Sequence, residues 1–286
     1  MIAFLLEPLQ YAFMRNAMLA ATLVGVLCAV VGAFVVLRGM AFLGDALAHA
    51  IMPGVAIVYL LGGAQGPLFW GALGAALLTT LGIGAVTRGG RVREDTAIGV
   101  IFAGMLALGI ALISATRSYA VDLTHILFGD VLSITSTDLW LIAGFGGGVL
   151  LLAAAFYKEL VIVSFDPVHA ATLRLPAEPL RYLLLMMVAV TVVVSLKTIG
   201  AGLMTAMLIT PAATGYLLTK RLDRMMGIAA LVAVGAGVAG LYLSYYLSVY
   251  DNVSIASGAA IVLVTTACFG VAWMAQTLRQ LWITRA

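Results

Sequence analysis

Two ionisable side chains stand four positions apart in the apolar stretch "LGDALAHAIMPG", which covers residues 43–54. Residues at i and i+4 of a helix share one face, with Cβ atoms about 5–6 Å apart, so this spacing brings Asp45 and His49 together. A carboxylate oxygen and an imidazole nitrogen suit a divalent first-row metal ion such as zinc, manganese or iron. Two ligands do not complete a metal site. A second interpretation therefore stays open, in which the pair bonds to itself or to a neighbouring helix and fixes the packing.

A second polar segment, 115–138, contains Asp122, His125 and Asp130. Asp122 and His125 are three positions apart and could share one helix face. Polar side chains in a connecting segment are usually solvated, so an ordinary loop is one interpretation. The other is an outer gate, or a docking surface for a partner that delivers cargo.

A third polar segment, "SFDPVHAATLRLP" (164–176), predicts a short capped helix. Asp166 is a typical N-cap residue, Pro167 fits the first helical position, and Pro176 marks the end. Such a helix could be gripped by a motor protein, or it could simply connect two longer elements.

The elements that must position these side chains are membrane-spanning helices. Of the 286 residues, 64% are hydrophobic and 9% are charged, whereas a soluble domain carries about 45–50% apolar and about 25% charged residues. Apolar runs of about 20 residues recur, and each is long enough to cross a bilayer as a helix. We therefore predict an all-α membrane protein with eight or nine transmembrane helices. The predicted spans are 15–37, 40–61, 67–87, 96–114, 139–157, 179–197, 199–218, 226–248 and 255–277.

The chain is predicted to form one transmembrane domain over residues 1–286. Residues 1–14 are apolar but interrupted by Glu7 and Pro8, which favours an interfacial helix. The sixth and seventh spans are separated only by "KTIG" and could instead form a tight re-entrant pair.

Lysine and arginine residues predict the orientation. The short loops "TRGGRVRED" (87–95) and "TKRLDR" (219–224) each hold three basic residues, and short basic loops face the cytoplasm. The membrane concerned is the cytoplasmic (inner) membrane. Both loops and the C-terminus are therefore expected on its cytoplasmic side. The segment 164–176 then falls inside, and 115–138 falls outside.

Several kinds of chemistry have no motif in this sequence. It has no Gly-Lys dipeptide, and so no G-x-x-x-x-G-K-[ST] loop for nucleotide phosphates. The motifs H-E-x-x-H and G-x-S-x-G are absent as well. We expect a transport subunit rather than an enzyme, with no permanently bound cofactor and no nucleic-acid partner.

Six motifs resemble, in order, those of integral-membrane permeases of ATP-binding-cassette importers for zinc, manganese and iron. The resemblance runs from about residue 15 to about residue 270. The motifs are "LRGMAFLGDALAHAIMPGVA", "REDTAIGVIFAGMLALG", "DLTHILFGDVL", "LVIVSFDPVHAATLRLP", "LITPAATGYLL" and "GLYLSYYL".

The resemblance implies a helical fold similar to the permeases for vitamin B12 and iron-siderophore uptake. It implies two permease subunits, identical or related, two cytoplasmic ATP-binding subunits and an extracytoplasmic metal-binding protein. Asp45 and His49 match the family's metal-coordinating pair, and 166–175 matches the helix that couples the permease to its ATPase. The residues expected to make the coupling contact are Asp166, Pro167, Ala170, Leu173 and Leu175.

Two rival functions remain open at this stage. A secondary carrier driven by protons would use Asp45 and His49 as a proton relay and would need no ATPase partner. A membrane scaffold or receptor would transport nothing.

Overall fold

A computed structural model of the chain describes residues 7–62, 67–114, 134–166, 170, 172–250 and 256–285. In these residues nine helices are long and apolar enough to cross a membrane, which confirms the larger of the two predicted numbers. Each predicted boundary lies within four residues of the observed one. The spans are Ala12–Leu37, Phe42–Gly62, Leu68–Thr87, Glu94–Ser114, Ser136–Ala155, Ala177–Lys197, Ala201–Leu218, Leu222–Tyr250 and Ser257–Gln280.

Two of the spans consist of more than one helical element, and one short helix, α10, lies between spans. The second span is α3 followed by α4, and the fifth is α8 and α9 joined by η4, a π-helical turn. The elements are η1 (Pro8–Gln10), α2 (Ala12–Leu37), α3 (Phe42–Ala50), α4 (Met52–Gly62), α5 (Leu68–Thr87), α6 (Glu94–Ser114), α8 (Ser136–Leu141), η4 (Ile142–Gly146), α9 (Gly147–Ala155), α10 (Tyr157–Phe165), α12 (Ala177–Ile199), α13 (Ala201–Leu218), α14 (Leu222–Tyr250) and α15 (Ser257–Arg285).

The structure describes the N-terminal region from residue 7 onward, so the interfacial helix expected over residues 1–14 stays a prediction. The described part of this region contains one 3₁₀ turn, η1, and then the start of the first spanning helix at Ala12. Tyr11, between the two, has an extended backbone (φ −84°, ψ 129°) and separates them. Residues 12–14 therefore belong to the spanning helix, which continues through the polar residues Arg15 and Asn16.

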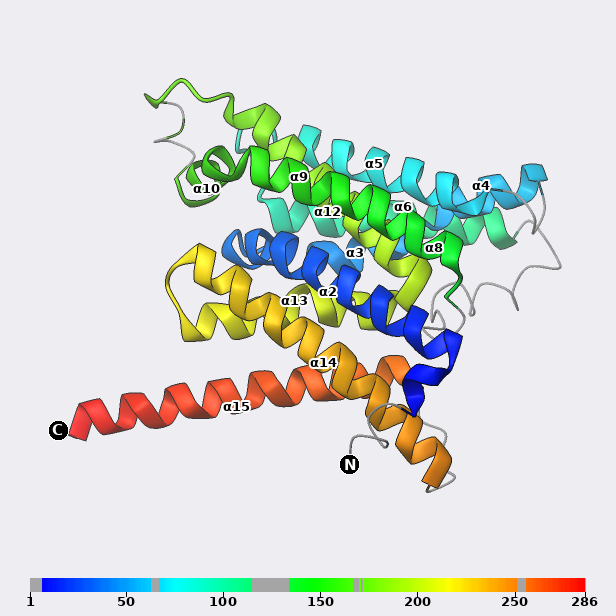
Figure 1. Cartoon of the computed structure of the whole chain (residues 1–286). Helices are drawn as coiled ribbons and strands as arrows, with labels where there is room; N and C mark the ends of the chain where they lie inside the picture. The colour runs from blue at the N-terminus through cyan, green and yellow to red at the C-terminus, as the bar shows by residue number, and fades with distance from the viewer. Residues whose placement is uncertain are drawn as a thin grey trace.

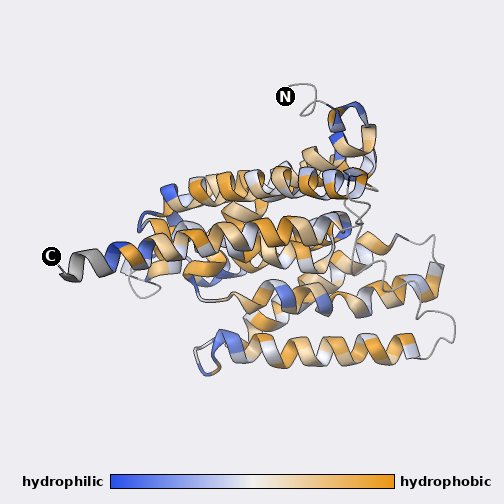
Figure 2. Cartoon of the chain, turned by 90° about the horizontal axis from the view of Figure 1, so that it is seen from below, coloured by the Kyte–Doolittle hydropathy of each residue, from blue (hydrophilic) through white to orange (hydrophobic). Residues whose placement is uncertain are grey.

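The spanning helices run side by side along one axis (Figure 1). α2 packs against α13 and α14, while α5 packs against α4 and α12. α2 is buried around most of its axis, while Leu19 and Leu23 are exposed on one side of its N-terminal half. α6 contacts α3 and α4 and buries few side chains, so it lies at an edge. Apolar residues cover the helices along their length, and hydrophilic residues gather at their ends (Figure 2).

The two ends of the bundle differ in charge. We call the end that holds the α5–α6 turn (88–93), the α13–α14 turn (219–221) and the C-terminus the basic end (Figure 1). At the opposite end, α2 begins and α14 ends. There Gly200 alone joins α12 to α13, with a positive φ of 78° that a glycine adopts without steric cost. The sixth and seventh spans are thus two separate helices, each long enough to cross a membrane.

α4 and α5 cross where two glycines face each other. A Cβ added to Gly71 would collide with the backbone oxygen of Gly54 and lie 2.6 Å from a methyl group of Val58. Small residues allow such close backbone approach between membrane helices.

Replacement of Gly71 by alanine is expected to destabilise the protein by about 1–3 kcal/mol, because α4 and α5 must separate. Gly74, three residues further along α5, has nothing within 4 Å of an added Cβ. Gly74→Ala is the matched control and should be neutral or stabilising, since alanine favours a helix by about 1 kcal/mol over glycine. Thermal unfolding in detergent measures both, and equal midpoints would contradict the proposed crossing.

Candidate metal centre

The helix that carries the candidate metal ligands is broken directly after them. α3 ends at Ala50 and α4 begins at Met52, with Ile51 between the two helices. Pro53 has no N–H group, so the carbonyl of His49 loses its usual helical donor and accepts the N–H of Ile51 instead. Pro53 thus accounts for the break between α3 and α4.

α6 packs closely against this break. Gly109 is buried in α6, and a Cβ there would lie 2.7 Å from Cβ of Met52 and 3.2 Å from Cδ of Pro53. The absence of a side chain at Gly109 therefore lets α6 support the broken helix from the side. This contact holds the start of α4, directly after the helix that carries the candidate ligands.

Asp45 and His49 lie together on one side of α3, as their spacing predicts. Nε2 of His49 is 3.8 Å from Oδ1 of Asp45, and the side chains are 34% and 42% exposed, respectively. A separation of 3.8 Å is too long for a hydrogen bond. The two side chains therefore lie at ion-pair distance without a hydrogen bond between them.

Aromatic rings border the pair, and the other side of α3 is buried. The ring of Phe102 in α6 lies 6.2 Å from the His49 ring, centroid to centroid, and 5.7 Å from that of Phe42. Leu43 and Leu47 are fully buried on the far side of the helix. We call the surface formed by Phe42, Asp45, His49 and Phe102 the α3–α6 face.

The described part of the chain does not complete a metal site around this pair. It contains no cluster of three or more His, Cys, Asp or Glu side chains that could hold an ion. The other predicted candidates, Asp122, His125 and Asp130, lie outside the described residues. Any further ligand must come from those residues, from another type of donor, from water or from another chain.

The predicted coupling segment has backbone hydrogen bonds that suit a short helix. Asp166 has an extended backbone, and its carbonyl accepts the N–H of Ala170 at 3.0 Å, as an N-cap carbonyl does. The N–H of Leu175 donates to the carbonyl of Ala170 at 3.1 Å, and Arg174 has a positive φ of 55°. These features match a Schellman motif that closes a helix. Pro167 lies outside the described residues.

Burial divides the described residues of this segment into two groups. Ala170 is fully buried against Val163 and Leu180, and Leu175 packs on the same small cluster. Leu173 is 50% exposed. One side of the segment therefore anchors it to α10 and α12, while Leu173 is free to contact another protein.

Arg181 ties three helices together at the basic end, which inspection of the sequence did not reveal. Its guanidinium donates to the carbonyl of Gly84 at 2.8 Å and to Oγ1 of Thr87 at 2.9 Å, both in the last turn of α5. It also lies 3.7 Å from a carboxylate oxygen of Glu94 at the start of α6, and 3.2 Å from Glu178. Arg181 thus caps α5 and connects α12 to α6.

A second guanidinium shares the same acidic partner. Burial lowers the pKa of Arg38, the negative charge of Glu94 opposes this change, and the positive charge of Arg181 adds to it. Nη1 of Arg38 is buried and has no hydrogen-bond partner among the described residues. Glu94 therefore balances two cations where α2, α6 and α12 come together.

Replacement of Arg181 by methionine is expected to destabilise the protein by about 1.5–3 kcal/mol, the range for hydrogen bonds to charged groups. The side chain is only 11% exposed, so water cannot replace its contacts freely. Glu178→Gln is the matched control, because Glu178 is 49% exposed and such surface ion pairs contribute little. Thermal unfolding compares the two variants. Similar unfolding midpoints for the two variants would show that the contacts of Arg181 contribute no more to stability than an exposed ion pair does.

An ion pair at the opposite end joins α8 to α12. Nζ of Lys197 lies 2.8 Å from a carboxylate oxygen of Asp138 and faces the ring of Phe69. Asp138 also forms a capping box with Thr135 at the start of α8. Inspection of the sequence did not reveal this ion pair. The signal that could have found it is that Lys197 and Asp138 each carry a charge near the end of an apolar run.

In the part of the chain that the structure describes, nine apolar helices and a half-exposed acid–base pair on a broken helix define a polytopic membrane protein with a polar site on the flank of its bundle. Residues 10–276 match the model of the ABC 3 transport family. The chain belongs to this family.

Known proteins resemble the chain over nearly its full length. It is 45% identical over 267 residues to the manganese transport system membrane protein MntC of Halalkalibacterium halodurans, covering 93% of this chain and 88% of that protein. It is 36% identical over 266 residues to the chelated iron transport system membrane protein YfeD of Yersinia pestis, covering 93% and 86%. The solved structure of PsaBC from Streptococcus pneumoniae in complex with Fab has a TM-score of 0.79 at 37% identity, covering 96% and 95%.

Proposed function

We propose that this chain is the permease subunit of an ATP-driven importer that moves a divalent metal ion, manganese, zinc or iron, across the cytoplasmic membrane. The observation that carries the proposal is the Asp45–His49 pair, half exposed on a membrane-spanning helix. Membership of the ABC 3 transport family and the manganese and iron names of its relatives support the same function. The metal is cargo, and Asp45 and His49 replace part of its hydration shell during passage.

A second permease subunit, identical or related, is proposed to cover the α3–α6 face. Asp45 is 42% exposed in the first turn of a membrane-spanning helix, and ionisable side chains within such helices face a partner or a cavity rather than lipid. α6 buries few of its side chains within this chain, which leaves room for a partner. Two facing subunits would bring two carboxylates and two imidazoles to one path, enough for a four-ligand site.

The proposed orientation places the basic end in the cytoplasm. The turns 88–93 and 219–221 are short and carry basic residues, as cytoplasmic loops do. The C-terminus and the segment 166–175 then face the cytoplasm as well. ATP-binding subunits would dock on this segment, because the permease has no phosphate-binding loop of its own.

Transport is proposed to proceed by alternating access. An extracytoplasmic metal-binding protein delivers the ion to the opposite end, where the segment 115–138, with Asp122, His125 and Asp130, forms the gate or docking surface. The ion then reaches Asp45 and His49. ATP binding and hydrolysis in the partner subunits move the coupling segments and open the path to the cytoplasm.

Reconstitution in vesicles tests this function against its rivals. We expect manganese uptake that requires both the ATP-binding subunits and ATP on the side of the vesicle membrane where these subunits are bound. Uptake by the permease alone, driven by a pH gradient, would instead establish a proton-coupled secondary carrier. Uptake of no divalent metal by the assembled complex would favour a scaffold or receptor.

A further inference from the structure

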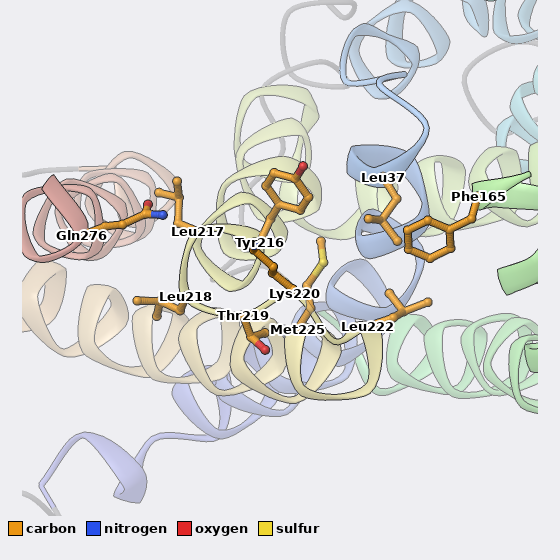
Figure 3. Close-up of a pocket in the computed structure, with 10 residues that line it drawn as sticks. All are labelled: Leu37, Phe165, Tyr216, Leu217, Leu218, Thr219, Lys220, Leu222, Met225 and Gln276. Atoms are coloured by element: carbon orange, nitrogen blue, oxygen red, sulfur yellow. The ribbon is translucent and has the colours of Figure 1, made fainter. Parts of the chain in front are cut away.

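A cavity of about 460 Å³ lies at the basic end, below the turn that joins α13 to α14. Its walls come from several helices that are far apart in the sequence (Figure 3). Leu37 and Phe165 lie at one side, and Leu217 and Gln276 lie at the other (Figure 3). Lys220 contributes a cation to the lining. The cavity is therefore long, largely apolar, and charged at one place.

The cavity extends to the membrane-facing helix α15. The C-terminal half of α15 runs away from α13 and α14 (Figure 1). Large apolar side chains on this half, Trp273, Met274 and Leu278, are more than half exposed. Gln276, on the same half, lines the cavity. The cavity therefore has one wall on a helix that exposes large apolar side chains on its other sides.

The turn above the cavity has an excess of positive charge. Lys220, Arg221 and Arg224 occur here with one acidic residue, Asp223. Arg221 pairs with Asp223 at 3.2 Å, whereas Lys220 has no carboxylate partner within the described parts of the chain. A negatively charged group near Lys220 would be attracted without displacing an existing ion pair.

We propose that this cavity binds an anionic phospholipid, with an acyl chain along Leu37 and Leu217 and the phosphate at Lys220. Basic pockets between membrane helices on the cytoplasmic side recognise anionic lipid headgroups in this way. A lipid fits better than the ATP-binding subunit, because the mostly apolar lining lies between membrane helices and includes a residue of α15, which exposes large apolar side chains. This inference goes beyond transport itself and makes the stability of the permease depend on the composition of one leaflet.

The test uses the full chain, purified in detergent, with three added probes. These are phosphatidylglycerol, phosphatidylcholine with the same acyl chains, and inorganic phosphate. Phosphatidylglycerol is expected to raise the midpoint of thermal unfolding by about 5 °C at saturating concentration, and the other two probes by much less. If both lipids raised the midpoint equally, the proposed contact between Lys220 and the lipid phosphate would be refuted. If inorganic phosphate raised it as much as phosphatidylglycerol, the proposal that the ligand is a lipid would be refuted.

Variants locate the binding site. Lys220 is exposed, so Lys220→Gln should preserve the fold and lose at least half of the shift caused by phosphatidylglycerol. Arg91→Gln removes an exposed cation from the other basic turn and should keep the full shift. Leu217→Trp should reduce the response by filling the cavity. Equal responses from Lys220→Gln and Arg91→Gln, or release of the bound lipid on addition of the ATP-binding subunits, would overturn the proposal.

Discussion

Exchange of Asp45 for asparagine, or of His49 for alanine, is expected to reduce ATP-driven manganese uptake by at least about 10–100-fold. Changes around a metal ligand already cause losses of that size, and here a ligand itself is removed or weakened. Both side chains are partly exposed, and neither supports the packing of α3, whose opposite side is buried. Expression, thermal stability and assembly with the ATP-binding subunits should therefore stay unchanged. Uptake of radioactive manganese into vesicles measures the effect.

Asp95→Asn is the matched control for this experiment. Asp95 is an exposed carboxylate in the first turn of α6, and its replacement removes the same charge from the chain. Its uptake should stay close to that of the unchanged protein. Normal uptake by both Asp45→Asn and His49→Ala would refute the metal centre. Loss of assembly in these variants would instead assign the pair a role in the contact between permease subunits.

Exchange of Leu173 for aspartate is expected to separate the ATP-binding subunits from the permease. Leu173 is half exposed in the coupling segment, so the change should leave the thermal stability of the isolated permease intact. Loss of an apolar anchor at the centre of an interface costs about 2 kcal/mol or more, roughly a thirty-fold weaker complex. Co-purification of the subunits, together with ATP hydrolysis by the complex, measures the loss.

Two comparison variants distinguish contact from folding. Leu218 is 51% exposed at the same end of the bundle but lies outside the coupling segment, so Leu218→Asp should retain the ATP-binding subunits. Ala170 is fully buried, and Ala170→Asp should both destabilise the segment and release the subunits, since an unpaired buried charge is strongly unfavourable. Retention of the subunits by Leu173→Asp would refute the docking site. Release by Leu218→Asp would show that the interface reaches beyond 166–175.

The architecture could be predicted closely because it follows from local composition. A bilayer requires runs of about 20 apolar residues, and such runs are visible in the sequence without knowledge of their neighbours. The break after His49 was predictable for the same reason, since Pro53 removes a donor from its own helix. The start of α2 at Ala12 was missed because an apolar run does not show where an interfacial turn ends.

In the candidate centre, only the contacts between residues of one helix could be predicted from the sequence. Asp45 and His49 are four residues apart, so helical geometry alone brings them together. The contacts of Arg181 with Gly84 and Thr87 span more than ninety positions, and the spacing of residues along one helix carries no information about them. The same holds for Lys197 and Asp138, which belong to different helices.

The single-residue connection at Gly200 has a mechanical consequence. α12 has 23 residues, so its far end lies about 34 Å from this joint at 1.5 Å per residue. A rotation of about 5° around Gly200 would move that end by about 3 Å, according to the same helix length. The end that moves follows the coupling segment directly and carries Arg181, which contacts α5 and α6. α12 thus has the geometry of an arm pivoted at one membrane surface, which turns a small tilt into a displacement of ångströms at the other.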